Sequence, residues 1–235
     1  VIIATVVVQS ITARSVATLL KVRAPAPTGY LFFGGSKFNR MLATEMLNQK
    51  LDVVVTDTNW DAIREARMMD IPVYFGNPMS DHAARHLELS TIGTVLIMSP
   101  YKQLNPPIAY HFENTLGKDK VWALTNNEQS TRPSHQVSNQ YAKKLMLFDE
   151  GVTYGYLASA VAKGSTIKTT PLSEEFDYEQ YIHKYGDRAT PLIAIDSDGK
   201  SFTFINGNSI EPKAGWRLIS LIEPEPEPVS QDGSE

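Results

Sequence analysis

The chain has 235 residues, a formal net charge of −4 and no cysteine. This length can bury a core in one large domain, or in one medium and one small domain. The lack of thiols excludes cysteine nucleophiles, disulfides and thiolate metal sites. The acidic balance argues against a nucleic-acid-binding surface, which needs a basic footprint.

The N-terminal stretch, residues 1–22, is strongly apolar and carries no charge before Arg14. A membrane-spanning helix needs about twenty apolar residues, so this run is too short to span a bilayer alone. It is interpreted as the end of a transmembrane helix in a fragment of a longer protein, with an N-terminal core helix as the alternative. The cations Lys21 and Arg23 would place the rest of the chain on the cytoplasmic side. Residues 23–29 are rich in proline and are predicted to be a linker.

The next stretch predicts one complete βαβ unit. The apolar run Tyr30–Phe33 ends at Gly34-Gly35-Ser36, a helical pattern follows over Phe38–Gln49, and Val53–Thr56 ends on Asp57. These are the parts of a dinucleotide-type site. Amides at the helix start would face a phosphate, and the carboxylate of Asp57 would accept hydrogen bonds from ribose hydroxyls. Alternatively, the glycines form only a tight turn and Asp57 only caps the next helix.

The alternation of strands and helices continues. Strands are predicted at 72–75, 94–98, 120–124 and 145–148, with helices between them that include one from about Asn105 to Leu116. This pattern predicts an α/β fold over residues 30–150, with a doubly wound, mostly parallel, Rossmann-like sheet. Ligands of such sheets lie beyond the carboxyl ends of the strands. The predicted nucleotide-binding residues lie at those ends: Gly34, Gly35, Ser36, Lys37, Phe38, Asn39, Asp57, Thr58, Asn77, Pro78, Met79 and Ser99.

The pattern changes after Gly151. Helices are predicted at 152–162 and 176–185, an extended piece at 166–170, and short strands at 191–195, 201–205, near Ile210 and at 216–222. The dipeptides Asp198-Gly199 and Asn206-Gly207 are hairpin-turn signals. Residues 151–222 are therefore predicted to form a small α+β appendage. The acidic, proline-rich residues 223–235 are predicted to be a disordered tail.

Three passages resemble a known family: "FFGGSKFNRMLATEML", "VVVTDTNWDAIREARMMDIPVYFGNPMSDH" and "PLIAIDSDGKSFTFINGNSIEPKAGWRLISLIE". They resemble the cytosolic regulatory region of bacterial monovalent cation:proton antiporters, which is similar to the regulator-of-potassium-conductance (RCK) domain. The resemblance implies a non-catalytic Rossmann unit that binds AMP, ADP or NAD(H) and gates an attached transporter. It also implies a homodimer at the cytoplasmic face of the bacterial inner membrane, with residues 1–22 as the end of the transporter's last membrane helix.

The glycine turn departs from the dinucleotide fingerprint at two positions. Ser36 and Asn39 stand where the second and third glycines are expected. Ser36 still admits a phosphate, whereas Asn39 is larger than the glycine that allows close helix–strand packing. A single phosphate therefore suits the turn better than a pyrophosphate, and Lys37 could pair with it, so AMP is favoured over ADP and NAD(H). Asp57 would repel a 2′-phosphate, which disfavours NADP.

Two enzymatic alternatives stay open. The second hypothesis is a soluble Rossmann NAD-dependent oxidoreductase, although the appendage offers no obvious catalytic acid or base. The third is a methyltransferase using S-adenosylmethionine, since Asn105-Pro106-Pro107-Ile108 is similar to an amino-methylating signature; it lacks the aromatic residue and is better explained as a helix start. His82 and His86 have metal-ligand spacing, but the metalloprotease pattern fails and no metal is predicted. Asp196–Gly199 is predicted to be a hairpin turn and not a calcium loop.

Overall fold

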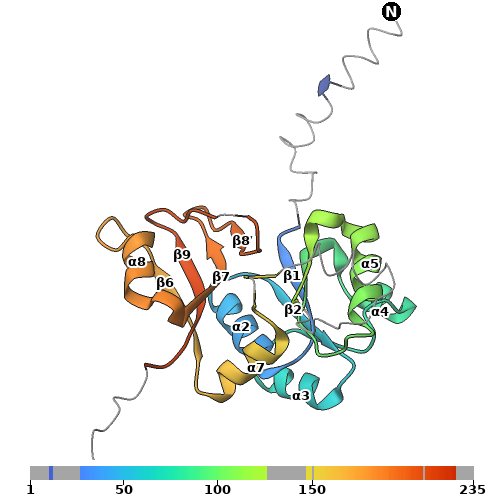
Figure 1. Cartoon of the computed structure of the whole chain (residues 1–235). Helices are drawn as coiled ribbons and strands as arrows, with labels where there is room; N and C mark the ends of the chain where they lie inside the picture. Colours follow the sequence, from blue (N-terminus) through green and yellow to red (C-terminus); the bar gives the residue numbers. More distant parts are fainter. Residues whose placement is uncertain (1–10, 13–26, 126–146, 150, 209, 226–235) are drawn as a thin grey trace, which may run out of the picture.

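The structure is a computed structural model that describes residues 11–12, 27–125, 147–149, 151–208 and 210–225. A five-stranded sheet and a four-stranded sheet lie on either side of helix α2 (Lys37–Asn48) (Figure 1). Most of the predicted N-terminal helix, of the predicted linker and of the predicted tail lies outside the described residues. Across those described ranges, no helix is both long and apolar enough to cross a membrane.

The first sheet is parallel, with strand order β3-β2-β1-β4-β5. Its strands are β1 (Gly29–Phe33), β2 (Val53–Asp57), β3 (Val73–Phe75), β4 (Ile92–Ile97) and β5 (Val121–Ala123). The chain crosses from β3 at one edge back to β4 beside β1, so the strand order reverses between β1 and β4. Such a switch point opens a crevice at the carboxyl ends of the strands. The predicted doubly wound Rossmann-like fold is confirmed.

Helices cover both faces of this sheet, as the continuous burial of β1 requires. Helices α2 and α3 (Trp60–Met68) contribute Leu42, Met46 and Ala66 to the core on one face. Helices α4 (Asp81–His86) and α5 (Asn105–Leu116) contribute Ala83 and Phe112 to the core on the other. Polar side chains cap three of these helices at their N-termini, and prolines lie in the first turn of the fourth, α5, which fixes where each helix starts.

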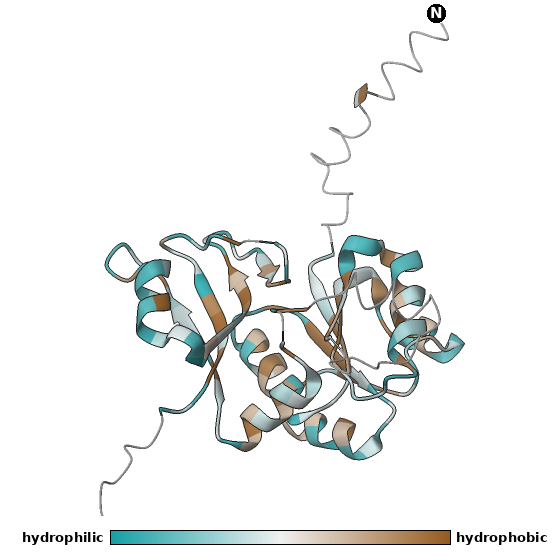
Figure 2. Cartoon of the chain, viewed as in Figure 1, coloured by the Kyte–Doolittle hydropathy of each residue, from teal (hydrophilic) through white to brown (hydrophobic). Residues whose placement is uncertain are grey.

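The second sheet is antiparallel, with strand order β6-β9-β7-β8. Its elements are α7 (Tyr154–Ala162), β6 (Thr166–Pro171), α8 (Tyr178–Tyr185), β7 (Ala189–Ile195), β8 (Ser201–Thr203) and β9 (Arg217–Ile222). Alternate residues of a strand point to opposite faces. Ile193 and Ile219 accordingly join the core around α2, whereas Ala194 and Leu218 pack on Tyr181 of α8. Figure 2 shows apolar residues on the strands and on the inner sides of α2 and α7.

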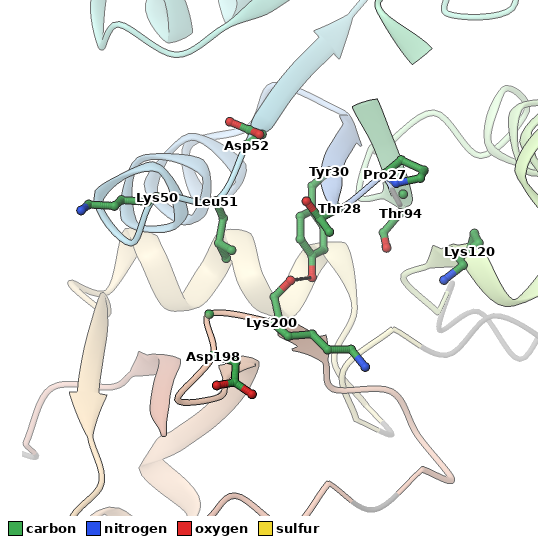
Figure 3. A pocket seen from close by; sticks show the side chains of 13 residues that line it. Pro27, Thr28, Tyr30, Lys50, Leu51, Asp52, Thr94, Lys120, Asp198 and Lys200 are labelled. Atoms are coloured by element: carbon green, nitrogen blue, oxygen red, sulfur yellow. Dashed lines mark hydrogen bonds between the residues drawn. The ribbon is translucent and has the colours of Figure 1, made fainter. Parts of the chain in front are cut away.

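Helix α2 is therefore shared between the two sheets, and polar contacts reinforce this arrangement. Glu45 on α2 accepts a hydrogen bond from Thr169 on β6. Arg217 at the start of β9 donates to Gln49, which ends α2, at 2.7 Å. The Tyr30 hydroxyl on β1 donates to Ser201 Oγ on β8 at 2.8 Å (Figure 3). A displacement of α2 relative to the first sheet would therefore also change the contacts that α2 makes with the second sheet.

The predicted sixth strand at 145–148 is wrong in its described part. Leu147 makes only an isolated bridge with Ile205, and Phe148 has a φ of 69°. Leu147 N–H donates to the carbonyl of Ala123 at 2.9 Å, and Phe148 N–H donates to that of Phe204 at 2.9 Å. The chain thus passes from one sheet to the other within two residues, which leaves no length for a strand.

Two smaller predictions also need correction. The strand expected near Ile210 does not form in the described residues around it. The sequence also predicts a helix capped by Ser80 or Asp81 that carries Ala84, Leu87 and Leu89. The observed helix α4 ends at His86, and Leu89 begins a 3₁₀ turn, Leu89–Thr91. The predicted hairpin turn at Asp198-Gly199 is confirmed: it joins β7 to β8, Gly199 has a positive φ, and Asp196 Oδ1 accepts from the N–H groups of Asp198 and Lys200. The chain also turns at Asn206-Gly207, where Gly207 has a positive φ, but this turn is closed only by an isolated bridge between Ile205 and Asn208.

Burial raises the pKa of Tyr181 to about 12, aided by neighbouring tyrosines, so folding opposes its ionisation. An unfolded tyrosine ionises near pH 10. The stabilisation from the neutral phenol is therefore complete below pH 10 and is lost as the pH rises from 10 to 12, by about 2–3 kcal/mol. In urea unfolding across this pH window, Tyr181→Phe should lose less stability than the wild type. Tyr110→Phe, at a ring that is 69% exposed, should keep the wild-type slope, and equal slopes for all three would contradict the prediction.

Candidate nucleotide-binding site

The turn between β1 and α2 lies at the switch point and requires its glycines. Gly34 has a φ of +119°, and a Cβ there would lie 2.6 Å from the carbonyl oxygen of Met98, at the end of β4. A Cβ on Gly35 would lie 2.9 Å from Cβ of Ala62 on α3. The turn is thus wedged between the ends of β4 and α3, which a side chain at either glycine would push apart.

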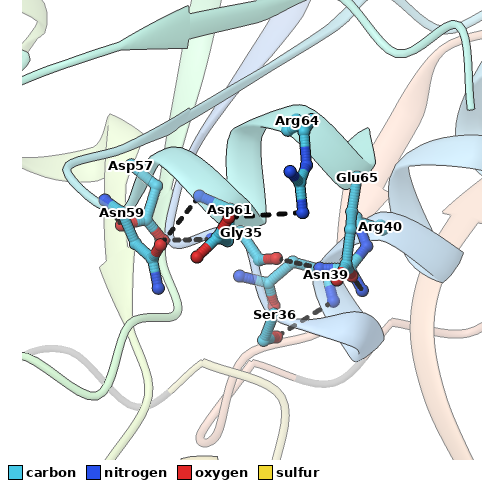
Figure 4. A network of polar contacts seen from close by, with 9 residues as sticks. All are labelled: Gly35, Ser36, Asn39, Arg40, Asp57, Asn59, Asp61, Arg64 and Glu65. Carbon is cyan, nitrogen blue, oxygen red and sulfur yellow. Dashed lines mark hydrogen bonds and ion pairs between the residues drawn. The ribbon is translucent and has the colours of Figure 1, made fainter. Parts of the chain in front are cut away.

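Asp57 ends β2 beside this turn and is only 3% exposed. Its carboxylate accepts hydrogen bonds from Gly35 N–H at 2.6 Å, from Asn59 N–H at 2.8 Å and from the Tyr101 hydroxyl at 3.2 Å. Figure 4 shows the carboxylate between Gly35 and Asn59. An ionised carboxylate offers about four acceptor positions. One position remains for a ribose hydroxyl, and the long bond from Tyr101 is the easiest to exchange.

The helix-cap interpretation of Asp57 is wrong, because a different residue caps α3. Asn59 is the N-cap, and its side chain accepts from Asp61 N–H at 2.9 Å. Asp57 instead joins the glycine turn to the strand end, so its carboxylate is held at the point where a ligand in the crevice would meet it.

The start of α2 provides the place for an anion. Ser36 is the N-cap, and its Oγ accepts from Asn39 N–H at 3.3 Å. The first amides of a helix have no carbonyl partner within it, and the helix dipole makes this end positive. Lys37, the first helical residue, is exposed and adds a mobile positive charge. This set of groups suits a phosphate.

Asn39 and Phe38 support the turn from below. Asn39 is 1% exposed, and its Nδ2 donates to the carbonyls of Gly34 at 2.7 Å and Met98 at 3.0 Å. The larger side chain at the third fingerprint position therefore fills the helix–strand gap with satisfied hydrogen bonds. Phe38 is buried and packs edge-on against Phe148, with ring centroids 6.3 Å apart. Both side chains therefore support the turn from within the fold, and neither offers a hydrogen-bond donor to a ligand in the crevice.

The remaining predicted residues lie at the same edge of the sheet. Thr58 is exposed directly after Asp57, and the side chain of Asn77 accepts from Met79 N–H at 2.9 Å. Ser99 is buried, and its hydroxyl donates to the side chain of Asn105 at 2.5 Å. The hydroxyl of Ser99 therefore forms its hydrogen bond within the segment that joins β4 to α5.

Pro78 is buried and lies in the turn after β3. Its predicted part in nucleotide binding stays a prediction. Asn105 begins α5 with prolines in its first turn, which supports the helix start over the methylating signature for Asn105-Pro106-Pro107.

Three further side chains at the site were not predicted. Arg40 on α2 donates to the Gly35 carbonyl at 2.5 Å and pairs with Glu65 of α3 (Figure 4). Burial and the negative charge of Asp57 raise the pKa of Tyr101 and of Tyr154, which begins α7. Tyr101 follows the end of β4 by a few residues, and this position in the sequence could have indicated that it lies at the site. Tyr154 is far along the chain and gave none.

The histidine pair on α4 makes contacts that suit a structural role. His82 Nδ1 lies 2.8 Å from the Tyr74 hydroxyl, and the ring of His82 stacks on that of His86 with centroids 3.9 Å apart. In the part of the chain that the structure describes, no three potential ligands gather to hold a metal ion.

Residues 30–142 match the family model of the TrkA-N domain. Slightly less than half of the chain thus matches the TrkA-N domain family. The match begins in β1 and includes the whole parallel sheet, the glycine turn and Asp57. The predicted RCK-type nucleotide-binding family is thereby confirmed for this segment. No curated protein matches the chain significantly.

Solved structures resemble the chain at low identity. The NAD(P)-binding domain of an exopolyphosphatase-related protein from Archaeoglobus fulgidus is 17% identical, with a TM-score of 0.36, over 44% of this chain and 77% of that one. The GsuK channel bound to NAD is 12% identical, with a TM-score of 0.41, over 86% of this chain and 38% of the channel. The chain therefore spans well under half of the channel's length, and its family assignment rests on the TrkA-N match.

Proposed function

We propose that the chain is the nucleotide-sensing regulatory region of a cation/proton antiporter, with sodium or potassium as the cation, and that its ligand is an adenine nucleotide. The observation that carries the proposal is the contact of Asp57 with the glycine turn at the start of α2. In support of the proposal, the contact holds a carboxylate beside a helix terminus, and these two groups suit ribose hydroxyls and a phosphate. Gly34, Gly35, Ser36, Lys37 and Asp57 form the centre of the proposed site.

AMP is the proposed ligand, with ADP or NAD(H) as the alternative. Lys37 is the exposed cation at the helix start, and a terminal monophosphate with two negative charges would gain most from it. Asp57 is buried and would repel a 2′-phosphate, so NADP should bind poorly. The adenine edge would reach the loop of Asn77, Pro78 and Met79 after β3, with Thr58 and Ser99 on either side.

The proposed regulation runs through α2. A ligand shifts a conformational equilibrium only through different affinities for the two states. Because α2 begins at the phosphate site and its other end contacts β6 and β9, a ligand that draws α2 toward the turn would alter the packing of the second sheet. We propose that this change reaches a membrane domain N-terminal to Pro27, and that the regulatory region works as a homodimer at the cytoplasmic face of the bacterial inner membrane.

Thermal unfolding with a panel of nucleotides tests the ligand. A ligand at about a hundred times its dissociation constant adds about 2.7 kcal/mol of stability. Among AMP, ADP, ATP, NAD, NADH and S-adenosylmethionine at equal concentration, AMP should give the largest rise in Tm. Lys37→Ala should reduce the rise with AMP but not with adenosine, because only the phosphate meets the lysine. A rise with S-adenosylmethionine alone would contradict the proposal.

A turnover assay separates the sensor from the oxidoreductase alternative. A sensor should bind NADH without any change in nicotinamide absorbance over hours in the presence of candidate carbonyl substrates. Steady oxidation of NADH would favour the enzyme. In everted vesicles containing the complete transporter, AMP should change the rate of cation-driven proton movement, and Asp57→Ala should remove that change.

A further inference from the structure

A cavity lies at the amino ends of the strands of the parallel sheet, whereas Asp57 lies at the carboxyl end of β2. It has a volume of about 450 Å³ and is lined from both halves of the molecule. The first residues of β1 and β4 and the residues just before β2 and β5 form one side, and the hairpin turn between β7 and β8 forms the other. The hydrogen bond from Tyr30 to Ser201 joins the two sides (Figure 3). None of the residues assigned to the nucleotide site lines this cavity.

Charged side chains from both halves of the molecule line this cavity: Lys50, Asp52 and Lys120 on one side, Asp198 and Lys200 on the other. In Figure 3, Lys120 and Lys200 lie on the same side of Tyr30 as Thr94, and the ammonium of Lys200 also lies 4.9 Å from the centre of the Phe202 ring. Lys50, Asp52 and Asp198 lie on the other side of Tyr30, with Asp52 and Asp198 well apart from each other. A ligand on the Thr94 side would meet two ammonium groups and a hydroxyl. The Asp52 carboxylate would accept hydrogen bonds from hydroxyl groups at the other end of such a ligand.

We propose that this cavity binds a small phosphoryl anion, with the phosphoryl group between Lys120, Lys200 and Thr94. Lysine ammonium groups give strong charge-assisted hydrogen bonds to phosphate as point charges, without the planar geometry that favours carboxylates at arginine. The threonine hydroxyl supplies a third donor from the strand side. If the anion is a phosphate monoester, its organic part lies along the Tyr30 ring toward Asp52.

The position of the cavity gives its ligand a regulatory consequence, which rests on the proposed function. Pro27 and Thr28, which lead into β1, also line the cavity. The carbonyl oxygen of Pro27 packs so closely on Gly93 that a Cβ there would approach it to 2.1 Å. An anion held by Lys120, Lys200 and Thr94 would therefore bridge the hairpin turn to the strand ends on which Pro27 packs, next to the point where we propose that the membrane domain is attached.

Titration of the ¹⁵N-labelled protein with inorganic phosphate and with glycerol 3-phosphate tests this site. The amide signals of Gly93, Thr94 and Gly199 should shift with either probe. Tighter binding of glycerol 3-phosphate would identify a monoester as the ligand, and equal binding would identify inorganic phosphate. The Lys120→Ala/Lys200→Ala variant should weaken binding about tenfold or more, and added salt should weaken wild-type binding.

Two control variants separate this site from the glycine turn. Lys118→Ala removes an exposed lysine from the same 3₁₀ turn as Lys120 but outside the cavity, and should bind phosphate as the wild type does. Lys37→Ala should also leave the shifts at Gly93 and Thr94 unchanged. The proposal is overturned if the double variant binds normally, or if Lys37→Ala abolishes the response. Stabilisation by AMP in the double variant reports separately on the nucleotide site, so the two proposals fail independently.

Discussion

Asp57→Ala should remove most of the stabilisation that AMP gives to the wild type. The carboxylate is buried and fixed by Gly35 and Asn59, so it accepts a ribose hydroxyl without reorganisation. A charge-assisted hydrogen bond contributes about 1.5–3 kcal/mol, or roughly 10- to 100-fold in Kd. At an AMP concentration that stabilises the wild type by about 2.7 kcal/mol, a 100-fold weaker variant would gain only about 0.4 kcal/mol. Urea unfolding with and without AMP measures this difference.

The matched control is Asp61→Ala. Asp61 lies in the first turn of α3 and pairs with Arg64 at 3.3 Å, but both side chains are exposed. The Asp61→Ala variant loses the same charge from the same region without any change at the glycine turn. It should therefore keep almost all of the stabilisation by AMP. Asp57→Asn retains the size of the side chain and should fall between the two. If Asp57→Ala and Asp61→Ala respond equally to AMP, Asp57 does not bind the nucleotide.

Gly34→Ala should destabilise the ligand-free protein by about 3 kcal/mol or more. Two penalties combine at this position. A φ of +119° is strained for any L-residue, and the added Cβ would lie 2.6 Å from the Met98 carbonyl and 2.9 Å from Asn39 Nδ2. The strand end or the turn must move, and the hydrogen bonds that Asn39 makes to both would be disturbed. The midpoint of urea unfolding should fall accordingly.

Gly117→Ala separates strain from close packing. Gly117 has a similar φ of +106°, but a Cβ there would meet nothing within 4 Å. The variant should therefore show the conformational penalty alone, about 1–3 kcal/mol. A larger loss for Gly34→Ala attributes the excess to contact with the end of β4. Equal losses would show that the turn has space for a side chain, contrary to the packing at the end of β4.

The parts of the site that could be predicted from sequence are those set by neighbours in the chain. The glycine turn, the helix after it and the carboxylate at the end of β2 lie within one βαβ unit, whose geometry follows from strand and helix patterns. The start of α5 at Asn105 was predicted for the same reason, since proline in a first turn has a local meaning. The parallel sheet then follows from repeated alternation.

The parts that could not be predicted depend on contacts between distant segments. In the sequence, Arg40 is one of several polar residues on a helix, and only the fold shows that Glu65 of α3 lies beside it. Tyr154 lies nearly a hundred residues after Asp57 in sequence and approaches it only because α7 packs against α2. In the sequence, Asn39 is only a residue larger than the glycine expected at that position. In the fold, its side-chain amide donates hydrogen bonds to two carbonyl groups. Residues 147–148 have an apolar strand pattern, yet they connect two sheets.

The structure of the complex with AMP tests the central claim most directly. We expect the phosphate within hydrogen-bonding distance, about 3 Å, of amides in the segment Ser36–Phe38, and a ribose hydroxyl on the Asp57 carboxylate in place of Tyr101. Adenylate bound away from both groups, for example between Lys120 and Lys200, with Asp57 still bonded to Gly35, Asn59 and Tyr101, would contradict the account.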